Sequence, residues 1–289
     1  MKLRLGIPKG SLEESTIALF SKAGYQITRT SRSYFPSIDD PEIEPMMVRP
    51  QEMSRYIEEG VLDLGLCGRD WVLENGSDVL EVAELIYSKQ TQNPVRWVLA
   101  VPENSEIKGA KDLEGKKIST EIVNIAKKWL KENGVNAKVE FSFGATEVKP
   151  PRLADAIIEL TETGSSLKAH NLKILETILF STTVLIANRS SYQDLEIRKK
   201  IDNIGLLLTG ALASYGKVGL KMNLHKDNLE KVLSLLPALK KPTIAFLSDK
   251  DWMDVDTIID EKIARELIPK LKASGVEGIV EYPLNKVIY

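Results

Sequence analysis

Short apolar runs alternate with amphipathic segments over the first two thirds of the chain, and this alternation constrains the fold more than any other feature. Residues 62–67 form an apolar run of strand length, whereas residues 50–60 place Met53, Tyr56 and Ile57 on one helical face. Alternating strands and helices are typical of an α/β fold with a largely parallel sheet. The 289 residues are enough for two or three domains of ordinary size.

Local signals predict where several of these elements begin and end. Ser11 and Glu14 have the spacing of a capping box, which predicts a helix that runs to about Ala23 and ends at Gly24. Pro50 suits the first turn of a second helix, because it has no N–H to leave unpaired there.

A change of pattern after residue 94 predicts a second lobe. The polar stretch 88–94 is followed by an apolar run at residues 95–101, where we expect the chain to enter a new sheet. We therefore expect residues 1–94 and 181–210 to form one lobe, and residues 95–180 to form the other. In such folds ligands bind in the cleft, at the carboxyl ends of strands.

The rhythm changes again near Gly216. Apolar residues at three- and four-residue steps predict a long helix from about residue 191 to residue 212. The remaining residues, taken as 211–289, read as a β-α-β-β-α-β succession, which is the ferredoxin-like unit. We expect its elements at residues 218–224, 227–236, 243–247, 252–259, 261–273 and 278–282.

Composition excludes several classes of protein. The 39 basic and 41 acidic residues leave a formal net charge of −2, which gives no reason to expect a nucleic acid or an anionic membrane as partner. Cys67 is the single cysteine, so an intrachain disulfide is impossible and a reducing, cytoplasmic compartment fits. No apolar segment is long enough for a signal peptide or a membrane span, and two histidines without ligand spacing argue against zinc.

The turn at residues 161–166 is the most informative short segment. It reads Thr-Glu-Thr-Gly-Ser-Ser and lies between an apolar run, 156–160, and a helix-like segment, 167–170. A strand, a glycine turn and a helix start gather N–H groups and hydroxyls around a phosphate, although turns also favour these residues for local reasons. Glu159 and Glu162 beside this turn indicate a magnesium ion or ribose hydroxyls, and so a phosphoribosyl donor.

The wider stretch from Gly144 to Asn188, GATEVKPPRLADAIIELTETGSSLKAHNLKILETILFSTTVLIAN, resembles the signature region of the ATP phosphoribosyltransferases, which open histidine biosynthesis. The similarity is long and ungapped. Glu159 stands where many members have Asp, and Ser166 where many have Thr, so both departures preserve the chemistry. The resemblance implies a two-lobed core similar to periplasmic binding proteins, with the active site in the cleft.

The C-terminal part, residues 211–289, is similar to the ACT-like regulatory domain of the long form of this family. There the domain binds L-histidine as an inhibitor and stabilises a less active hexamer, whereas short forms depend on a separate subunit. Dimer and hexamer are therefore the homo-oligomers that the resemblance implies. Three positions align with the histidine pocket: Asn223, Leu239 and Thr243. Many relatives have Asp in place of Asn223, so we expect either weaker feedback or an ion pair of the effector with another carboxylate.

The resemblance implies attack by adenine N1 of ATP on C1 of 5-phosphoribosyl 1-pyrophosphate, with release of pyrophosphate and with Mg²⁺ as cofactor. Positioning and electrostatics should dominate, without a covalent enzyme intermediate. Glu159 would meet the ribose hydroxyls directly or through the metal, and Lys9 would contact a phosphate. Both are the candidate catalytic residues. The donor side comprises Glu159, Thr161, Glu162, Thr163, Gly164, Ser165 and Ser166.

The ATP side of the cleft is assigned by the same resemblance to two strand-to-helix junctions and the first turn: Lys9, Gly10, Arg49, Leu66, Gly68, Arg69 and Asp70. Asp70 has an alternative role, since Asp at such a position often caps the following helix. Two other functions stay open at this point. One is a non-catalytic two-lobed ligand-binding or sensor protein, and the other is an enzyme of the same type that uses a different nucleobase.

Overall fold

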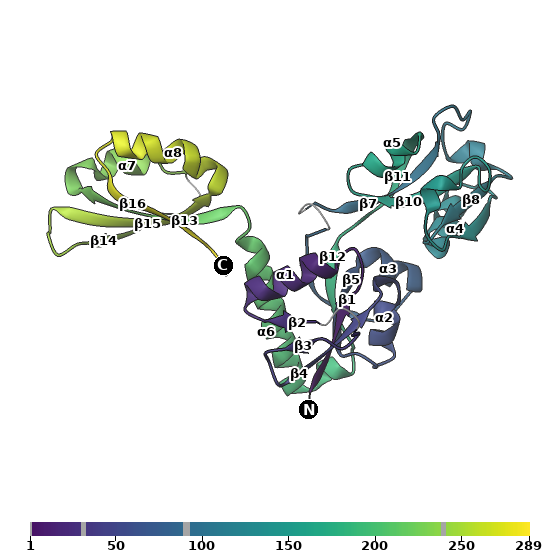
Figure 1. Cartoon of the computed structure of the whole chain (residues 1–289), viewed down its shortest axis with the longest axis horizontal. Helices are drawn as coiled ribbons and strands as arrows, with labels where there is room; N and C mark the ends of the chain where they lie inside the picture. Colours follow the sequence, from purple (N-terminus) through teal and green to yellow (C-terminus); the bar gives the residue numbers. More distant parts are fainter. Residues whose placement is uncertain (1, 30–32, 89–92, 238–240) are drawn as a thin grey trace. The chain divides into compact units, whose positions relative to one another are not determined.

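The computed structural model describes residues 2–29, 33–88, 93–237 and 241–289. The chain divides into two compact units, Met1–Thr209 and Gly210–Tyr289. The first unit contains two five-stranded sheets and the second contains one four-stranded sheet (Figure 1). Each unit is described by itself below.

The first sheet has the strand order β4-β1-β5-β12-β6. β1 is parallel to β4 and β5, whereas β12 is antiparallel to β5 and β6. Apolar side chains such as Leu5, Ile7 and Leu64 are wholly buried in it. The strands are β1 (Leu3–Pro8), β4 (Ile43–Val48), β5 (Leu64–Gly68), β6 (Leu80–Leu85) and β12 (Thr183–Ala187), with the short pair β2 (Ile27–Thr28) and β3 (Ser37–Ile38) outside it.

Three helices follow β1, β4 and β5: α1 (Glu13–Ala23), α2 (Pro50–Glu58) and α3 (Arg69–Asn75). The capping-box prediction for α1 is wrong, because the residue before the helix has no side-chain cap. Instead Gly10, at φ 108°, donates its N–H to Glu13 Oε2 at 3.4 Å. The predicted end at Gly24 is confirmed, since Gly24 has φ 103° and its N–H bonds to carbonyls of the last turn.

The second sheet has the order β11-β7-β10-β8-β9. β10 is parallel to β8 and antiparallel to β7, so the donor turn after β10 follows a central strand. Its elements are β7 (Val95–Pro102), β8 (Lys117–Thr120), α4 (Val123–Glu132), β9 (Lys138–Phe141), β10 (Ala156–Thr161), α5 (Ser165–Ala169) and β11 (Leu172–Ser181).

The apolar periodicity of residues 121–133 predicts a helix from Glu121, whereas helix α4 begins at Val123. The reason is a tertiary cap. Glu74, in α3, accepts hydrogen bonds from the N–H groups of Asn124 and Ile125, each at 2.9 Å. A carboxylate at this end also suits the helix dipole. Burial raises the pKa of Glu74, and these N–H donors act in the opposite direction.

The chain passes from the first sheet to the second between β6 and β7, and it returns between β11 and β12. Helix α3 belongs by sequence to the first sheet, yet its Trp71 packs in the apolar core of the second sheet with Trp97 and Leu99. The two indole rings meet edge to face, with centroids 6.1 Å apart. Apolar burial of this kind stabilises the contact between the lobes.

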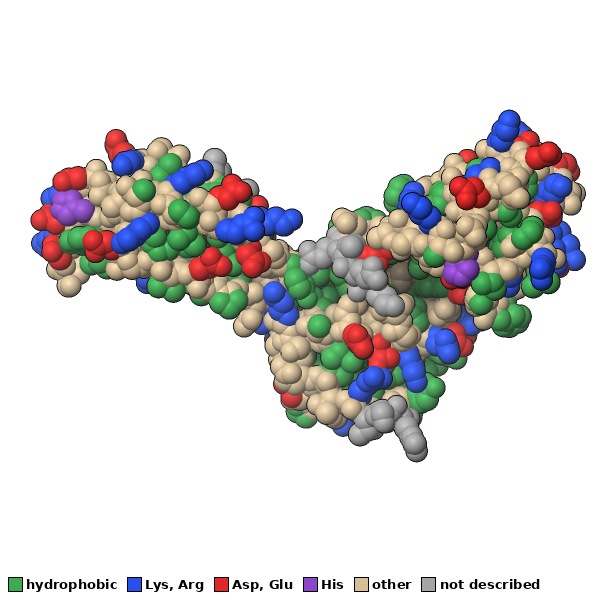
Figure 2. Space-filling view, turned by 45° about the horizontal axis from the view of Figure 1, so that its top comes forward, with side chains coloured by type: hydrophobic (Ala, Val, Ile, Leu, Met, Phe, Trp, Pro, Cys, Tyr) green, Lys and Arg blue, Asp and Glu red, His purple; other side chains and the backbone are tan. Residues whose placement is uncertain are grey.

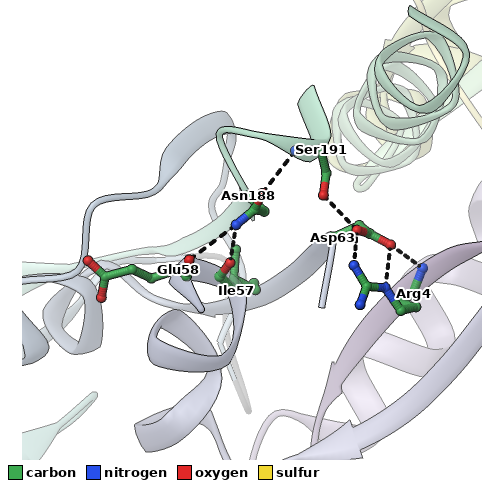
Figure 3. A network of polar contacts seen from close by, with 6 residues as sticks. All are labelled: Arg4, Ile57, Glu58, Asp63, Asn188 and Ser191. Atoms are coloured by element: carbon green, nitrogen blue, oxygen red, sulfur yellow. Dashed lines mark hydrogen bonds and ion pairs between the residues drawn. The ribbon is translucent and has the colours of Figure 1, made fainter. Parts of the chain in front are cut away.

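A polar network ties the first sheet together at the amino ends of β1 and β5 (Figure 3). Asp63 accepts hydrogen bonds from Arg4 Nε at 2.9 Å, from Arg4 Nη2 at 2.6 Å and from Ser191 Oγ at 2.6 Å. Asn188, just after β12, donates Nδ2 to the carbonyl of Ile57 at 2.7 Å and accepts from the Ser191 N–H at 2.9 Å. The buried carboxylate and amide are thereby satisfied.

The long helix α6 (Leu195–Ala213) begins in the first unit and ends in the second. Its sheet has the order β14-β15-β13-β16, with every neighbouring pair antiparallel. Helices α7 and α8 cover one face of this sheet (Figure 1), and Leu220, Met222 and Leu271 are buried between the two layers. The elements are β13 (Lys217–His225), α7 (Leu229–Leu235), β14 (Thr243–Phe246), β15 (Trp252–Asp260), α8 (Glu261–Ala273) and β16 (Glu277–Pro283).

This order and strand pairing confirm the predicted ferredoxin-like unit, and the two sheets of the first unit confirm the predicted two-lobed α/β core. Basic and acidic side chains are interspersed on the face shown in Figure 2, in keeping with the small net charge. Within the described residues, the structure has no helix whose length and apolar character would let it span a membrane.

Candidate active site

A cavity of about 380 Å³ opens at one edge of the first sheet and reaches β10 of the second sheet. Because parallel strands end at the same edge, the residues that follow β1, β4 and β5 meet there with the start of the antiparallel β12. The lining includes basic, acidic and hydroxyl groups from both lobes, among them Lys9, Arg49, Asp70, Glu159, Thr161 and Glu162.

Most of the predicted ATP-side residues reach this cavity. Its lining contains Lys9 and Gly10 after β1, Arg49 after β4, and Gly68 with Asp70 after β5. The geometry follows from the sequence, because each of these residues lies at the carboxyl end of a parallel strand or within two residues after it.

Leu66 and Arg69 do not line the cavity. Leu66 is wholly buried in β5, and the Arg69 guanidinium forms ion pairs with Glu81 and Glu84. In this arrangement neither residue therefore contributes to the cavity wall. A motif fixes the position of a residue along the chain, whereas the direction of its side chain depends on the strand face and on partners such as Glu84.

The Lys9 N–H donates a hydrogen bond to the Val48 carbonyl at 2.8 Å, which fixes the backbone at Lys9. Its ammonium lies 3.6 Å from the centre of the Tyr34 ring, a cation–π contact. Within the described ranges, Lys9 forms no ion pair with a carboxylate. Its positive charge is therefore available to an anionic ligand.

Asp70 is almost wholly buried, and its carboxylate already has partners. Oδ2 accepts a hydrogen bond from Trp97 Nε1 at 2.6 Å, and Oδ1 accepts from the Trp71 N–H at 3.0 Å. Burial raises the pKa of Asp70, while the donors, Trp97 first, lower it. Asp70 is not the N-cap of α3. That position is Gly68, and Asp70 lies inside the first turn of the helix.

Glu159 is half-buried in β10, where it faces the cavity from the second lobe. It accepts a hydrogen bond from the Leu160 N–H at 2.9 Å, and the Thr146 hydroxyl acts to lower its pKa. Burial raises the pKa of Glu159 to about 7, and the nearby carboxylates of Glu121 and Glu147 act in the same direction. A cation bound beside the Glu159 carboxyl would act to lower its pKa, against both burial and the neighbouring carboxylates.

The donor turn lies partly on the cavity wall. Thr161 and Glu162 line the cavity, whereas Thr163, Gly164, Ser165 and Ser166 lie outside its lining. Gly164 has φ 81° and donates its N–H to Thr161 Oγ1 at 2.8 Å, a left-handed conformation that favours glycine. The Ser166 hydroxyl donates to Glu147 Oε1 at 3.0 Å.

The carboxylates of Glu121, Glu159 and Glu162 line the same cavity. Mg²⁺ is commonly held by one or two carboxylates together with substrate phosphates, so this donor set fits the ion. Within the described ranges, no three His, Cys, Asp or Glu side chains are arranged to hold a metal by themselves. A metal here would therefore depend on ligands supplied by the substrate.

Several lining residues were not predicted from the sequence: Gln51, Trp71, Tyr87, Ser88, Trp97, Glu121, Ser181, Thr182 and Thr183. Most of them lie on α3 or on the two segments that cross between the lobes. The sequence did contain a signal for them. The predicted crossovers near residues 94 and 181 join the two lobes, so these segments must pass beside the cleft. Edge position alone does not reveal which side chains face the cavity.

The predicted regulatory residues belong to the second unit. Asn223, on β13, is paired with Asp254 of β15 across the strands. Thr243 is exposed on β14 and lines a separate cavity of about 700 Å³ that also contains Lys217, Tyr282 and Tyr289. Leu239 lies outside the described residues.

Comparisons with known proteins assign the whole length of the chain. The family profile described as ATP phosphoribosyltransferase matches residues 49–210, and the profile described as HisG, C-terminal domain, matches residues 215–286. An ATP phosphoribosyltransferase of Solibacter usitatus is 61% identical over 288 residues, which cover 100% of each chain. One of Chlorobium chlorochromatii is 58% identical over 286 residues, 99% of this chain and 97% of its own.

A solved structure shares the fold over 71% of the chain. The ATP phosphoribosyl transferase (HisG:HisZ) complex from Thermotoga maritima has a chain that covers 71% of this one, and 98% of that chain is matched. The TM-score is 0.61 at 30% sequence identity.

Proposed function

The chain belongs to the ATP phosphoribosyltransferase family, and we propose that the cavity between its lobes is where ATP and 5-phosphoribosyl 1-pyrophosphate react. The reaction is the first step of L-histidine biosynthesis, and it is a pentosyl transfer. Adenine N1 of ATP attacks C1 of the ribose, the bond from C1 to the pyrophosphate oxygen breaks, and N1-(5-phosphoribosyl)-ATP and pyrophosphate result.

One observation carries the placement of the reaction. Basic side chains from the first lobe, Lys9 and Arg49, line the same cavity as Glu159, Thr161 and Glu162 from the second lobe. Two polyanionic substrates need cationic groups, and a ribose ring with a bound cation needs carboxylates. A plain binding protein for one anion has no need of the carboxylate set.

We assign roles by charge and position. Lys9 and Arg49 would bind phosphate groups and stabilise the negative charge that develops on the departing pyrophosphate. Glu159 would hold the ribose hydroxyls, and the donor turn from Thr161 to Ser166 would bind the 5-phosphate, with Gly164 allowing close backbone approach. Glu159 and Glu162 are the side chains that would hold Mg²⁺, which when bound neutralises charge on the pyrophosphate.

The test is an assay with ATP, 5-phosphoribosyl 1-pyrophosphate and Mg²⁺, in which adduct absorbance and pyrophosphate release are followed together. Wild-type protein should give both products in equal amounts. Lys9→Met and Glu159→Gln should each lower kcat/KM by roughly 100-fold, whereas Lys116→Met, at an exposed position of the second lobe, should not. Binding of the donor without any adduct would favour the non-catalytic alternative, and faster adduct formation with GTP would favour another nucleobase.

The second unit extends the proposal to regulation. We assign it histidine binding around Asn223, Leu239 and Thr243, with inhibition of the first unit and a change from dimer to hexamer. Because the chain carries its own regulatory unit, it should need no separate regulatory subunit. Sedimentation velocity with and without L-histidine tests the assembly, and inhibition kinetics test the effect. A cytoplasmic location, expected from the single cysteine, is part of the same proposal.

A further inference from the structure

A hydrogen bond joins the first crossover between the lobes to the donor turn. Ser88 lies between β6 and β7, and its hydroxyl donates to Glu162 Oε1 at 2.6 Å. Glu162 is the second residue of the turn after β10, so the bond connects two segments that lie 74 residues apart in the sequence. An ionised carboxylate can only accept, which makes Ser88 the donor. The distance is that of a charge-assisted hydrogen bond.

Both partners belong to the wall of the candidate active-site cavity. Ser88 is buried and Glu162 is half-buried, and both residues line the cavity. A hydrogen bond between a hydroxyl and a carboxylate is stronger at such a site than in bulk water, because the local dielectric is lower and less water competes for the donor. Loss of the Ser88 hydroxyl would therefore deprive the Glu162 carboxylate of a donor where water replaces it poorly.

The backbone just before Ser88 is anchored to the first lobe. The Tyr87 hydroxyl lies 2.7 Å from Thr16 Oγ1 on α1, and the Tyr87 carbonyl accepts from Thr183 Oγ1 on β12 at 3.1 Å. Tyr87 is also buried, so packing holds its ring in addition to these bonds. The Ser88 hydroxyl is therefore presented from a fixed position, which is what a group that orients another side chain requires.

Hydrogen bonds inside the second lobe set the shape of the donor turn. An example is the Gly164 N–H, which donates to Thr161 Oγ1 at 2.8 Å within the turn itself. The bond from Ser88 differs from this one, because its donor comes from a crossover segment whose backbone is held by the first lobe. It therefore determines where the Glu162 carboxylate lies relative to the first lobe.

The junction between the lobes does not depend on this bond alone. Trp71 of α3 packs in the apolar core of the second sheet, and Asp70 accepts a hydrogen bond from Trp97 Nε1 at 2.6 Å. Removal of the Ser88 hydroxyl should therefore leave the two lobes joined. It would instead free the Glu162 side chain to sample other rotamers, and a donor that binds there would have to restrict them again.

We propose that Ser88 is a positioning residue for phosphoribosyl transfer, which holds the Glu162 carboxylate in the orientation that receives the donor. The inference rests on the proposed function, because it takes the turn after β10 as the place where 5-phosphoribosyl 1-pyrophosphate binds. Two other roles for Ser88 predict different results. A purely structural serine would affect only stability, and a serine that itself touched the substrate would act independently of Glu162.

The experiment measures donor binding and turnover for Ser88→Ala, Glu162→Ala and the double variant in the full chain. Ser88→Ala should raise the Kd of 5-phosphoribosyl 1-pyrophosphate, measured by calorimetry with Mg²⁺ and without ATP, by roughly 10-fold, as expected for loss of a hydrogen bond to a charged group. The KM for this donor should rise equally, and the KM for ATP should change by less than about twofold. In the Glu162→Ala background, removal of the Ser88 hydroxyl should change the donor Kd by less than about twofold, because its partner is already absent.

Ser191→Ala is the matched control. Ser191 Oγ donates to Asp63 Oδ1 at 2.6 Å, so this variant loses the same kind of bond outside the cavity lining. It should lower the urea midpoint of unfolding and leave the donor Kd unchanged. A donor Kd of Ser88→Ala within about twofold of wild type, or an undiminished further loss in the Glu162→Ala background, would overturn the inference. A wild-type protein that makes no adduct would instead overturn the proposed function.

Discussion

The carboxylate of Asp70 accepts a hydrogen bond of 2.6 Å from the indole Nε1 of Trp97, and this bond joins α3 of the first sheet to β7 of the second. The N–H of Asp70 also donates to Ser181 Oγ at 3.1 Å, on the segment by which the chain returns to the first sheet. Asp70 therefore contacts the first strand after one crossover, through Trp97, and the start of the other crossover, through Ser181. We interpret it as a residue that fixes the cleft as well as one that lines it.

Asp70→Asn should weaken this junction, because one carboxylate acceptor is replaced by an amide donor. The free energy of unfolding should fall by about 1–3 kcal/mol, and the tryptophan emission spectrum should shift as the Trp97 indole loses its partner. Urea unfolding monitored by fluorescence checks both. An unchanged midpoint and an unchanged spectrum would contradict the assignment.

Asp63→Asn should reveal a pH-dependent contribution to stability. Burial acts to raise the pKa of Asp63, but hydrogen bonds from Arg4 and Ser191 outweigh it, so the folded pKa lies below its usual range. The stabilisation is therefore fully present above the unfolded pKa near 4, and it is lost as the pH falls through the folded value. At neutral pH we expect Asp63→Asn to cost about 1–3 kcal/mol.

Denaturant unfolding at several pH values measures this difference. The gap between wild type and Asp63→Asn should be widest near neutrality and should close in acid. Asp78→Asn is the matched control, because Asp78 pairs with Arg189 at an exposed site and should contribute within about 0.5 kcal/mol. A gap that is independent of pH would show that the charge of Asp63 is not what stabilises the network.

Gly164→Ala should distinguish the role of the donor turn in catalysis from its role in the stability of the fold. The φ of 81° makes any side chain unfavourable there, and the added Cβ would lie 3.4 Å from Ile174 Cδ1. Gly115 has a similar φ of 68° in the same lobe, with nothing within 4 Å of an added Cβ. Both alanine variants should lose about 1 kcal/mol of stability, but only Gly164→Ala should lose transfer activity, by roughly 100-fold.

Circular dichroism and steady-state kinetics of the two glycine variants give the comparison. Normal turnover by Gly164→Ala, with the expected loss of stability, would mean that the 5-phosphate binds elsewhere. Equal losses of activity in both variants would point to a general effect of backbone strain in the second lobe.

Asn223→Asp should strengthen histidine inhibition at a cost in stability. An aspartate could form an ion pair with the effector's ammonium group, so the inhibition constant should fall by roughly tenfold, equivalent to about 1.4 kcal/mol. The new carboxylate would also face Asp254 across the strands, and like charges in such a pair are destabilising. Inhibition kinetics and Tm measured without histidine test the two parts, and an unchanged inhibition constant would exclude Asn223 from the pocket.

The sequence predicted the element order well because its signals are local. Periodicity identified α2 and the whole β-α-β-β-α-β succession, and Gly24 ended its helix as expected. The errors arose at helix starts. Ser11 does not cap α1, which has no side-chain cap, and Glu74 caps α4 from another lobe.

The sequence predicted which positions along the chain belong to the candidate site. It did not predict which of their side chains point into the cavity. Residues after parallel strands, such as Arg49, converge because the sheet topology requires it. Side-chain direction was not available, so Leu66 was grouped with its neighbours although it is wholly buried.

The network around Asp63 and Asn188 lies at the amino ends of β1 and β5, and the cavity lies at their carboxyl ends. The length of β1 and β5 therefore keeps the residues that stabilise the fold apart from the residues that line the cavity. Substitutions at one end should combine with those at the other almost independently, because they share no partners. A laboratory lineage could therefore gain heat resistance around Asp63 first and retune its substrate preference afterwards, without one improvement undoing the other.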